Sequence, residues 1–277
     1  MSNKVYQIVT DRILEALENG TVPWHKPWKG GGLPTNLKSK KPYRGINTFM
    51  LSLTGFSSRY WLSYKQAKAM GGQVRKGEKS TMVVFWKWVD GEDKESGKEK
   101  RFPILRYYNV FNLDQIDGIA DPDEKGEDRE HTPIESAEKI IEGMPNRPEI
   151  QHKEQRAYYS LGADFVNMPR PESFDNGEEY YSTLFHELGH ATRHESRLNR
   201  EKNSYAQEEL VAEMTSAFLC GVSGIESATL DNSAAYIESW RKRISDDPRL
   251  VVTAGAQAQK ASDYIQGISH GKEESDD

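Results

Sequence analysis

The sequence predicts an α+β protein of two domains, a small mixed α/β domain with a β-hairpin and a mainly helical domain with a short sheet. Aromatic and β-branched residues fill two stretches before residue 112, as in paired strands. Apolar residues at helical spacing dominate after residue 176. The acidic segment 119–133, with two prolines, separates these patterns. We therefore predict domains at 1–118 and 134–270, a linker at 119–133 that leaves their orientation open, and a disordered tail at 271–277.

The first domain combines helices with the hairpin. Three prolines and three consecutive glycines exclude regular structure from residues 22–34. Ser63 is placed to cap one short helix, and Gly71 to end it. We expect helices at 4–19, 47–57 and 63–72, and strands at 81–89 and 102–111.

The second domain is mainly helical. Its short strands precede a long helix around residue 186, and an edge strand in that place can pair with an extended peptide. We expect helices at 134–143, 179–191, 205–219, 233–245 and 254–265, and strands at 148–151, 156–160 and 164–168.

Composition excludes some classes of protein. The single cysteine, Cys220, allows no internal disulfide, and its apolar surroundings predict a buried side chain. No apolar run approaches the roughly 18 residues that a membrane span needs. The first 20 residues carry charges throughout, unlike a secretory signal. We therefore expect no membrane partner and a cytoplasmic location.

The strongest chemical signal is His186-Glu187-Leu188-Gly189-His190, which matches H-E-x-x-H. Two imidazoles four residues apart lie on one face of a helix, within reach of one metal ion. Glu187, on the flank of that face, can address a water at the metal. Leu184, Phe185 and Leu188 give this helix an apolar side to bury, which a chance match would lack.

A catalytic zinc site needs a third protein ligand. The helical stretch after residue 205 offers Glu209, which lies 19 residues after His190, far enough for a turn and an antiparallel return. Glu208 is the competing ligand, about 100° round the helix. One turn beyond Glu209, Glu213 is placed to accept the other ring N–H of a ligating histidine and fix its tautomer.

His194 adds a third histidine on the same face. It lies about 12 Å along the axis from His186, too far for one ion to bind all three, so it is a substrate-side or structural residue. The pattern with a glycine and a third histidine six residues after the second is absent. The site therefore favours a glutamate-ligand zincin, a gluzincin, over a three-histidine zincin.

Charge is divided unevenly along the chain. Residues 1–118 carry 20 Lys+Arg against 11 Asp+Glu, net +9, and the remainder carries 17 against 32, net −15. Five of the six tryptophans also lie in the first part. Cations that follow phosphates and rings that stack on unpaired bases are what single-stranded nucleic acid binding requires.

Basic loops and aromatics of the first part are the candidate DNA contacts. A tryptophan in a proline-rich loop is also a frequent core residue, and a basic loop is often only solvated. The candidates are Trp24, Lys26, Trp28, Lys38, Lys41, Tyr43, Arg44, Arg75, Lys76 and Lys79. One face of the hairpin must be core, and the aromatics of the other face are free to meet bases.

Over nearly its whole length the chain resembles the ArdC family of antirestriction proteins. The N-terminal resemblance rests on Val22-Pro-Trp24, Pro27-Trp28, Pro34-Thr-Asn36, Tyr43-Arg-Gly-Ile-Asn47, Val74-Arg-Lys-Gly-Glu78 and Tyr108-Asn-Val-Phe-Asn112. The C-terminal resemblance rests on Phe185-His-Glu-Leu-Gly-His190, Ser196-Arg-Leu-Asn-Arg200 and Glu208-Glu-Leu-Val-Ala-Glu213.

This resemblance implies a single-stranded DNA-binding domain followed by a zincin-like metallopeptidase domain. It also implies a role in mobile DNA such as plasmids or phages, where incoming single strands are shielded from host restriction. The peptide substrate is not implied.

The residues predict one Zn²⁺ per chain, held by His186, His190 and Glu209. Glu187 acts as general base toward water and then returns the proton to the leaving amine. An oxyanion donor is required, and Tyr158, Tyr159 and His194 are the candidates. Protein or peptide substrates, including DNA-bound host proteins, follow from this site.

Two rival functions remain. In the first, the protein coats single-stranded DNA and its metal site is structural or inactive. In the second, the peptidase is latent and acts only on DNA-bound partners. A metal-dependent nuclease fits less well, because nucleases favour carboxylate-rich magnesium sites.

Overall fold

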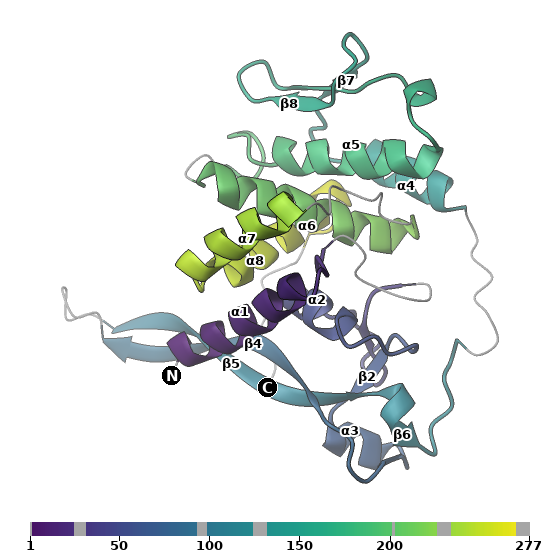
Figure 1. Cartoon of the computed structure of the whole chain (residues 1–277), viewed down its shortest axis with the longest axis vertical. Helices are drawn as coiled ribbons and strands as arrows, with labels where there is room; N and C mark the ends of the chain where they lie inside the picture. The colour runs from purple at the N-terminus through teal and green to yellow at the C-terminus, as the bar shows by residue number, and fades with distance from the viewer. Residues whose placement is uncertain are drawn as a thin grey trace.

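The computed structural model describes residues 2–24, 32–92, 99–123, 132–200, 203–225 and 234–269. Within these ranges the chain is mixed α+β. Figure 1 shows layers that run from a small sheet over α5, through the α6, α7 and α8 helices and α1, to the long hairpin β4–β5.

The N-terminal part holds one long helix, two short ones and a sheet. Its helices are α1 (Ser2–Glu18), α2 (Ile46–Ser52) and α3 (Tyr64–Ala69). Its strands are β1 (Thr35–Asn36), β2 (Tyr60–Leu62), β3 (Gln73–Val74), β4 (Thr81–Glu92), β5 (Glu99–Asn112) and β6 (Ile116–Asp117), with the 3-10 turn η1 (Leu113–Gln115) before β6.

The hairpin is longer than the sequence predicted. Strands β4 and β5 pair from Thr81 opposite Val110 to Glu92 opposite Glu99. Strand β2 adds to β5, and β1 pairs in parallel with β2, which gives the order β1-β2-β5-β4. Strands β3 and β6 form a separate antiparallel pair. The short strands β1, β2, β3 and β6 are missed by periodicity, because two or three residues are too few for a pattern.

The C-terminal part holds the helices that build the site. They are α4 (Pro133–Glu142), α5 (Gly177–Ala191), α6 (Tyr205–Ser223), α7 (Ala234–Asp246) and α8 (Leu250–Ile265). The strands β7 (Glu149–Gln151), β8 (Tyr158–Ser160) and β9 (Phe165–Asn167) form a sheet of order β7-β9-β8, followed by the 3-10 turn η2 (Pro171–Ser173). All three strands lie where the sequence placed them, and β8 is an edge strand beside α5.

One hydrophobic core joins the two parts. It contains Val9 and Ile13 of α1 together with Met214 and Phe218 of α6, all at most 1% exposed. The ring of Phe49, on α2, stacks on Phe218 with centroids 5.0 Å apart. The expectation that the linker leaves the orientation of the two parts open is therefore wrong, because burial of a shared core fixes them against each other.

Some elements differ from their predicted extents. Helix α2 ends at Ser52, where the sequence predicted 57, and α8 begins at Leu250, four residues earlier than predicted. The predicted tail 271–277 lies outside the described residues. So do loop residues 25–31, which include the candidate DNA contacts Lys26 and Trp28.

Candidate metal centre and nucleic-acid interface

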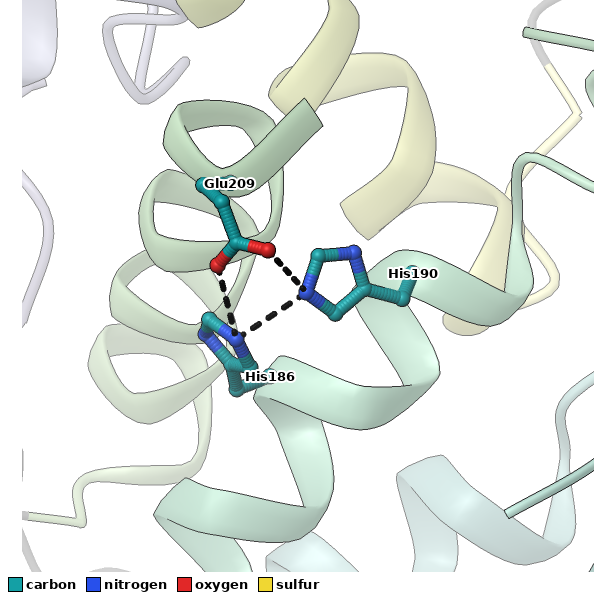
Figure 2. A group of neighbouring side chains, drawn as sticks. All are labelled: His186, His190 and Glu209. Atoms are coloured by element: carbon teal, nitrogen blue, oxygen red, sulfur yellow. Dashed lines mark hydrogen bonds and ion pairs between the residues drawn. The ribbon is translucent and has the colours of Figure 1, made fainter. Parts of the chain in front are cut away.

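Helix α5 carries both histidines on the face turned toward α6. The side chain of Asn176 caps the helix by accepting a hydrogen bond from the backbone N–H of Glu179, 2.8 Å away. His186 and His190 lie one turn apart, so their rings point to the same side. Their Nε2 atoms are 3.1 Å apart (Figure 2).

Helix α6 supplies the third donor. Its N-cap is Ser204, and Glu209 lies in its second turn. One carboxylate oxygen of Glu209 is 3.8 Å from His186 Nε2, and the other is 3.7 Å from His190 Nε2. Figure 2 shows the three side chains pointing toward a common centre.

The three donors fit a single divalent ion. Donor atoms of His186, His190 and Glu209 all lie within 4.8 Å of one another. Two ligands that are each about 2.0–2.1 Å from a tetrahedral ion are about 3.3 Å apart, close to the separations found here. Burial and the neighbouring His190 lower the pKa of His186 to about 3, which keeps its imidazole neutral, as a metal ligand must be.

Gly189 allows the two helices to approach. A Cβ atom built at Gly189 would lie 3.1 Å from Ala212 Cα and 3.3 Å from Thr215 Cβ. Residue Ala212 is one turn after Glu209, so this contact sets how closely Glu209 approaches the histidines. The glycine in the middle of the motif therefore serves the geometry of the metal cluster.

Glu187 is buried beside the cluster. Its side chain is 8% exposed, and burial raises its pKa to about 7. His190 opposes this rise, and so does a hydrogen bond with the Tyr159 backbone. A carboxyl with a pKa near neutrality suits a group that both takes and returns a proton.

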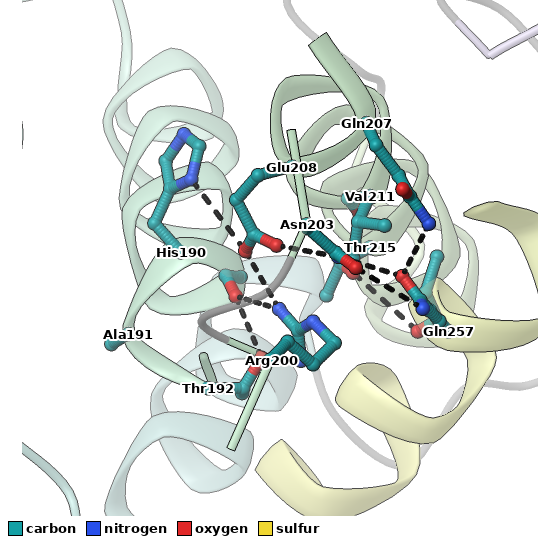
Figure 3. Close-up of polar contacts among 12 residues, drawn as sticks. His190, Ala191, Thr192, Arg200, Asn203, Gln207, Glu208, Val211, Thr215 and Gln257 are labelled. Carbon is teal, nitrogen blue, oxygen red and sulfur yellow. Dashed lines mark hydrogen bonds and ion pairs between the residues drawn. The ribbon is translucent and has the colours of Figure 1, made fainter. Parts of the chain in front are cut away.

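Glu208 faces away from the three-donor cluster. Its carboxylate accepts hydrogen bonds from Arg200 at 2.8 Å and Asn203 at 3.0 Å, and lies 3.9 Å from His190 Nδ1 (Figure 3). Arg200 also donates to Thr192 Oγ1 and to the carbonyl of Gly189. The structure thus places Glu209, and not Glu208, among the donors, while Arg200 ties the end of α5 to α6.

Glu213 has a different role from the one the sequence suggested. Its carboxylate accepts hydrogen bonds from Trp24 Nε1 and from the hydroxyl of Tyr236, both at 2.5 Å. The carboxylate that lies beside Nδ1 of His190 belongs to Glu208. We therefore correct the prediction that Glu213 orients a ligating histidine: it connects α6 with α7 and with the loop after α1.

A cleft of about 420 Å³ opens over the cluster. Tyr158 and Tyr159 of β8 form one wall, and Tyr205, at the start of α6, contributes another. Two guanidinium groups also line the cleft, Arg156 from the loop before β8 and Arg193 from the end of α5. Sequence reasoning missed Tyr205 and both arginines, since none belongs to a recognisable motif.

The three oxyanion candidates lie in different places. Tyr159 donates its hydroxyl to Asp164 at 2.7 Å, and that of Tyr158 lies 3.2 Å from Glu154. His194 hydrogen-bonds through Nδ1 to Ser196 and does not line the cleft. Of the two roles predicted for His194, substrate-side or structural, this contact supports the structural one. The side chain of Tyr205, which also lines the cleft, hydrogen-bonds to Glu209, one of the three donors.

Two aromatic DNA candidates are core residues. Trp24 is 1% exposed and holds Glu213. Tyr43 is buried, and its hydroxyl accepts a hydrogen bond from Asn36 at 3.3 Å. Neither ring can stack on a base, so both predictions are corrected.

The basic candidates divide into paired and exposed groups. Arg44 forms an ion pair with Asp263 of α8, and Arg75 forms one with Glu78 at 3.1 Å. The lysines are exposed in the loops before α2 and β4. They are Lys38, Lys41, Lys76 and Lys79.

The hairpin presents aromatic rings that the sequence only partly indicated. The strand register separates the two faces of the hairpin. Phe85 lies opposite Arg106 and Val83 opposite Tyr108, so these side chains share one face. The rings of Phe85 and Tyr108 are 5.7 Å apart on that face, with exposed Lys87 beside them. Tyr108 also hydrogen-bonds to Tyr43, which brings the loop with Lys41 next to this face.

The other hairpin face carries Trp86, Trp88 and Tyr107. Trp86 contacts Tyr6 of α1 edge to face, with centroids 6.2 Å apart. Trp88 and Tyr107 are 52% and 53% exposed. Because both faces carry exposed rings beyond the core, this hairpin is the largest aromatic surface in the described part of the chain.

A paired histidine helix and a glutamate helix beside a short sheet define a zincin-like metallopeptidase fold. A family model described as "Zincin-like metallopeptidase" matches residues 135–257. A second model, described as the N-terminal domain of anti-restriction factor ArdC, matches residues 3–111.

Solved structures agree with these models over the whole chain. The metal-free crystal structure of the antirestriction ArdC protein from plasmid R388 is 40% identical, covers 96% of this chain and 99% of its own, and superposes with a TM-score of 0.78. The Mn(II)-bound structure of that protein gives 0.75, covering 95% and 97%. The chain therefore belongs to the ArdC antirestriction protein family.

Other relatives are longer or similar in length. The DNA primase TraC of Escherichia coli is 37% identical over 94% of this chain, which spans only 20% of that relative. The uncharacterized protein y4eC of Sinorhizobium fredii is 34% identical over 94% of this chain and 91% of its own length. In the described residues, no helix is long and apolar enough to cross a membrane.

Proposed function

We propose that this chain is a zinc-dependent peptidase that also binds single-stranded DNA and acts against restriction of mobile DNA. The observation that carries the peptidase is the cluster of His186, His190 and Glu209 with buried Glu187 beside it. Nitrogen and carboxylate donors at this spacing favour zinc. The R388 relative has also been solved in an Mn(II)-bound form, which supports the binding of a divalent metal by this family.

The chain's own residues account for the chemistry around the ion. When bound, the divalent ion supplies Lewis acidity at the centre of the cluster. Glu187 takes a proton from the attacking water and returns it to the leaving amine, a cycle that its pKa of about 7 suits. Strand β8 offers a free edge that pairs with an extended substrate. The hydroxyl of Tyr205 is placed to donate to the developing oxyanion.

A peptide-cleavage assay tests this function. The zinc-loaded protein is incubated with a proteome-derived peptide library, and new ends are identified by mass spectrometry. We expect cleavage by the native chain and a loss of about 10²- to 10⁴-fold in Glu187→Gln, with zinc retained. Equal cleavage by that variant would remove Glu187 from the mechanism.

We place the DNA interface on the hairpin face that carries Phe85, Lys87 and Tyr108. Stacked rings and cations on one face are the combination that unpaired bases and phosphates require. The Tyr108–Tyr43 hydrogen bond adds Lys41 and Lys38 to the same surface. Binding without sequence preference follows, because every base has a face to stack. We place the protein in the cytoplasm, where it would meet incoming single strands.

The opposite hairpin face provides a matched control. Phe85→Ala should weaken binding of a thymidine oligonucleotide by about 1–3 kcal/mol, as expected for one stacked base. Trp88→Ala removes a ring from the other face that is 52% exposed, against 41% for Phe85, and should change affinity little. Equal losses in both variants would mean that DNA contacts both faces, and no loss in either would remove the hairpin from the interface.

The binding-only rival rests on the same hairpin surface. In this alternative the protein coats single-stranded DNA, and the metal cluster only stabilises α5 against α6. The two functions differ in the peptide assay and not in the DNA assay.

A further inference from the structure

The cleft over the metal cluster contains two guanidinium groups that the proposed reaction does not use. Arg156 stands in the loop that leads into β8, and Arg193 lies three residues after His190, at the end of α5. The two elements that bound the cleft therefore each contribute one permanent positive charge.

Neither guanidinium has an ion pair within the described residues. Arg156 lies over the ring of Tyr158, with its guanidinium carbon 5.1 Å from the centroid. Arg193 has its Nε atom buried, without a hydrogen-bond partner in the described part of the chain. A guanidinium that lines a cleft without an ion-pair partner favours an anionic ligand there, because its charge-assisted hydrogen bonds are otherwise not made within the protein.

The acidic groups of the cleft are engaged elsewhere. Glu208 is held by Arg200 and Asn203. Glu209 faces the two histidines, where it would neutralise part of the charge of a bound divalent ion. Glu187 is close enough to Arg156 for that cation to lower its pKa, yet burial outweighs this effect. With a divalent ion bound, the cleft would thus carry an excess of positive charge.

We propose that this cleft selects substrates with a carboxylate close to the scissile bond, bound by Arg193 and Arg156. The inference rests on the proposed peptidase function, since it names the substrate class of that site. Arginine binds carboxylates through paired N–H donors, and such pairs are strong where water is partly excluded. Acidic side chains and a free C-terminal carboxylate offer the same chemistry.

Binding to an inert variant tests the inference apart from turnover. The zinc-loaded Glu187→Gln protein is titrated into three pools of fluorescein-labelled hexapeptides, and fluorescence anisotropy is read. One pool carries Glu at a fixed central position and an amidated end. The second carries Gln there and an amidated end. The third carries Gln and a free carboxylate.

We expect the Glu pool to bind about tenfold more tightly than the amidated Gln pool, the factor for one charge-assisted hydrogen bond. Stronger binding of the third pool alone would also support a carboxylate site and assign it to the chain end. Equal binding of all three pools, or binding of none, would overturn the inference.

Variants of the two arginines identify the binding groups. Arg193→Gln and Arg156→Gln should each reduce the tenfold preference, whereas Arg193→Lys, which keeps the charge and loses the paired donors, should reduce it less than Arg193→Gln does. Lys68→Gln removes an exposed positive charge on α3, outside the cleft, and should leave it unchanged. Thermal melting of each variant shows whether it is folded, and Arg193→Lys keeps the test decisive if Arg193→Gln is not.

The two proposals fail separately. A carboxylate preference in Glu187→Gln, without peptide cleavage by the native chain, would support this inference and reject the peptidase. Cleavage at sites without neighbouring acidic residues, together with equal binding of the pools, would support the peptidase and reject this inference.

Discussion

The metal cluster and the β4–β5 hairpin are built in opposite ways. Three donors and Glu187 come together between two packed helices, and their positions depend on close contacts such as Gly189 against Ala212. The hairpin instead leaves its rings in solvent, beyond the part of the strands that contacts the core. A site of the first kind is organised before its ligand arrives, whereas a surface of the second kind gains its contacts on binding.

Substitution of Glu209 should disrupt the metal cluster most strongly, and its neighbour Glu208 provides the matched control. Glu209→Gln should lower zinc affinity by more than about 100-fold, because a ligand that contributes charge is lost. Glu208→Gln should keep about one zinc per chain, since Gln can still accept from Arg200. Elemental analysis of both purified variants measures this, and the reverse pattern would make Glu208 the ligand.

Acidity should affect the buried site through Glu187. The pKa of Glu187 is raised from 4.5 to about 7 in the folded chain, so the folded state binds this proton more tightly than the unfolded state. The metal-free protein should therefore lose stability as pH rises from about 4.5 to 7, by roughly 3 kcal/mol. Urea unfolding at pH 5 and pH 7.5 measures this slope, and Glu187→Gln should flatten it. An unchanged slope in that variant would contradict the assignment.

Separation of α5 from α6 should weaken the cluster without touching a donor. Gly189→Ala places a Cβ 3.1 Å from Ala212 Cα, closer than an ordinary contact. We expect a stability loss of about 1–3 kcal/mol and weaker zinc binding, with DNA affinity unchanged. Urea unfolding measures the stability loss, and zinc titration with a competing chelator measures the zinc affinity. A normal zinc affinity would show that the helices can relax.

Trp24→Phe should have the smallest effect of these substitutions, and it separates a buried ring from the exposed rings of the hairpin. Trp24→Phe removes the N–H that Glu213 accepts, and should cost about 1–3 kcal/mol of stability because a buried carboxylate loses a donor. DNA affinity should not change, in contrast to Phe85→Ala. Parallel unfolding and oligonucleotide titrations measure both, and a DNA defect in Trp24→Phe would return this ring to the interface.

The two regions also differ in how far the sequence could predict them. His186, Glu187 and His190 are local in the chain, so helical spacing places them together before any tertiary contact is known. Glu209 required only the assumption of an antiparallel return. The fold class and the hairpin followed from periodicity in the same way, and the family models and the solved relatives agree with them.

Long-range contacts account for the errors. The burial of Trp24 depends on Glu213, 189 positions away, and Arg44 meets Asp263 across 219 positions. Spacing along the chain carries no information about such pairs. The sequence left two roles open for His194 for a related reason, because its hydrogen bond to Ser196 depends on how the chain turns after α5. The arginines of the cleft could have been noticed only once β8 was known to cover α5.

The shared core has a consequence for synthesis on the ribosome. Helix α1 is made before α7 and α8, against which it packs. At about 5–20 residues per second, the apolar side of α1 waits roughly 10 to 50 s for its partners. During that interval the nascent chain exposes the apolar face of an amphipathic helix. Helix α6, which carries Glu209, also lacks its packing partner α8 until α8 has been made. Completion of the core, and with it the final packing of α6, thus waits until α8 has been made.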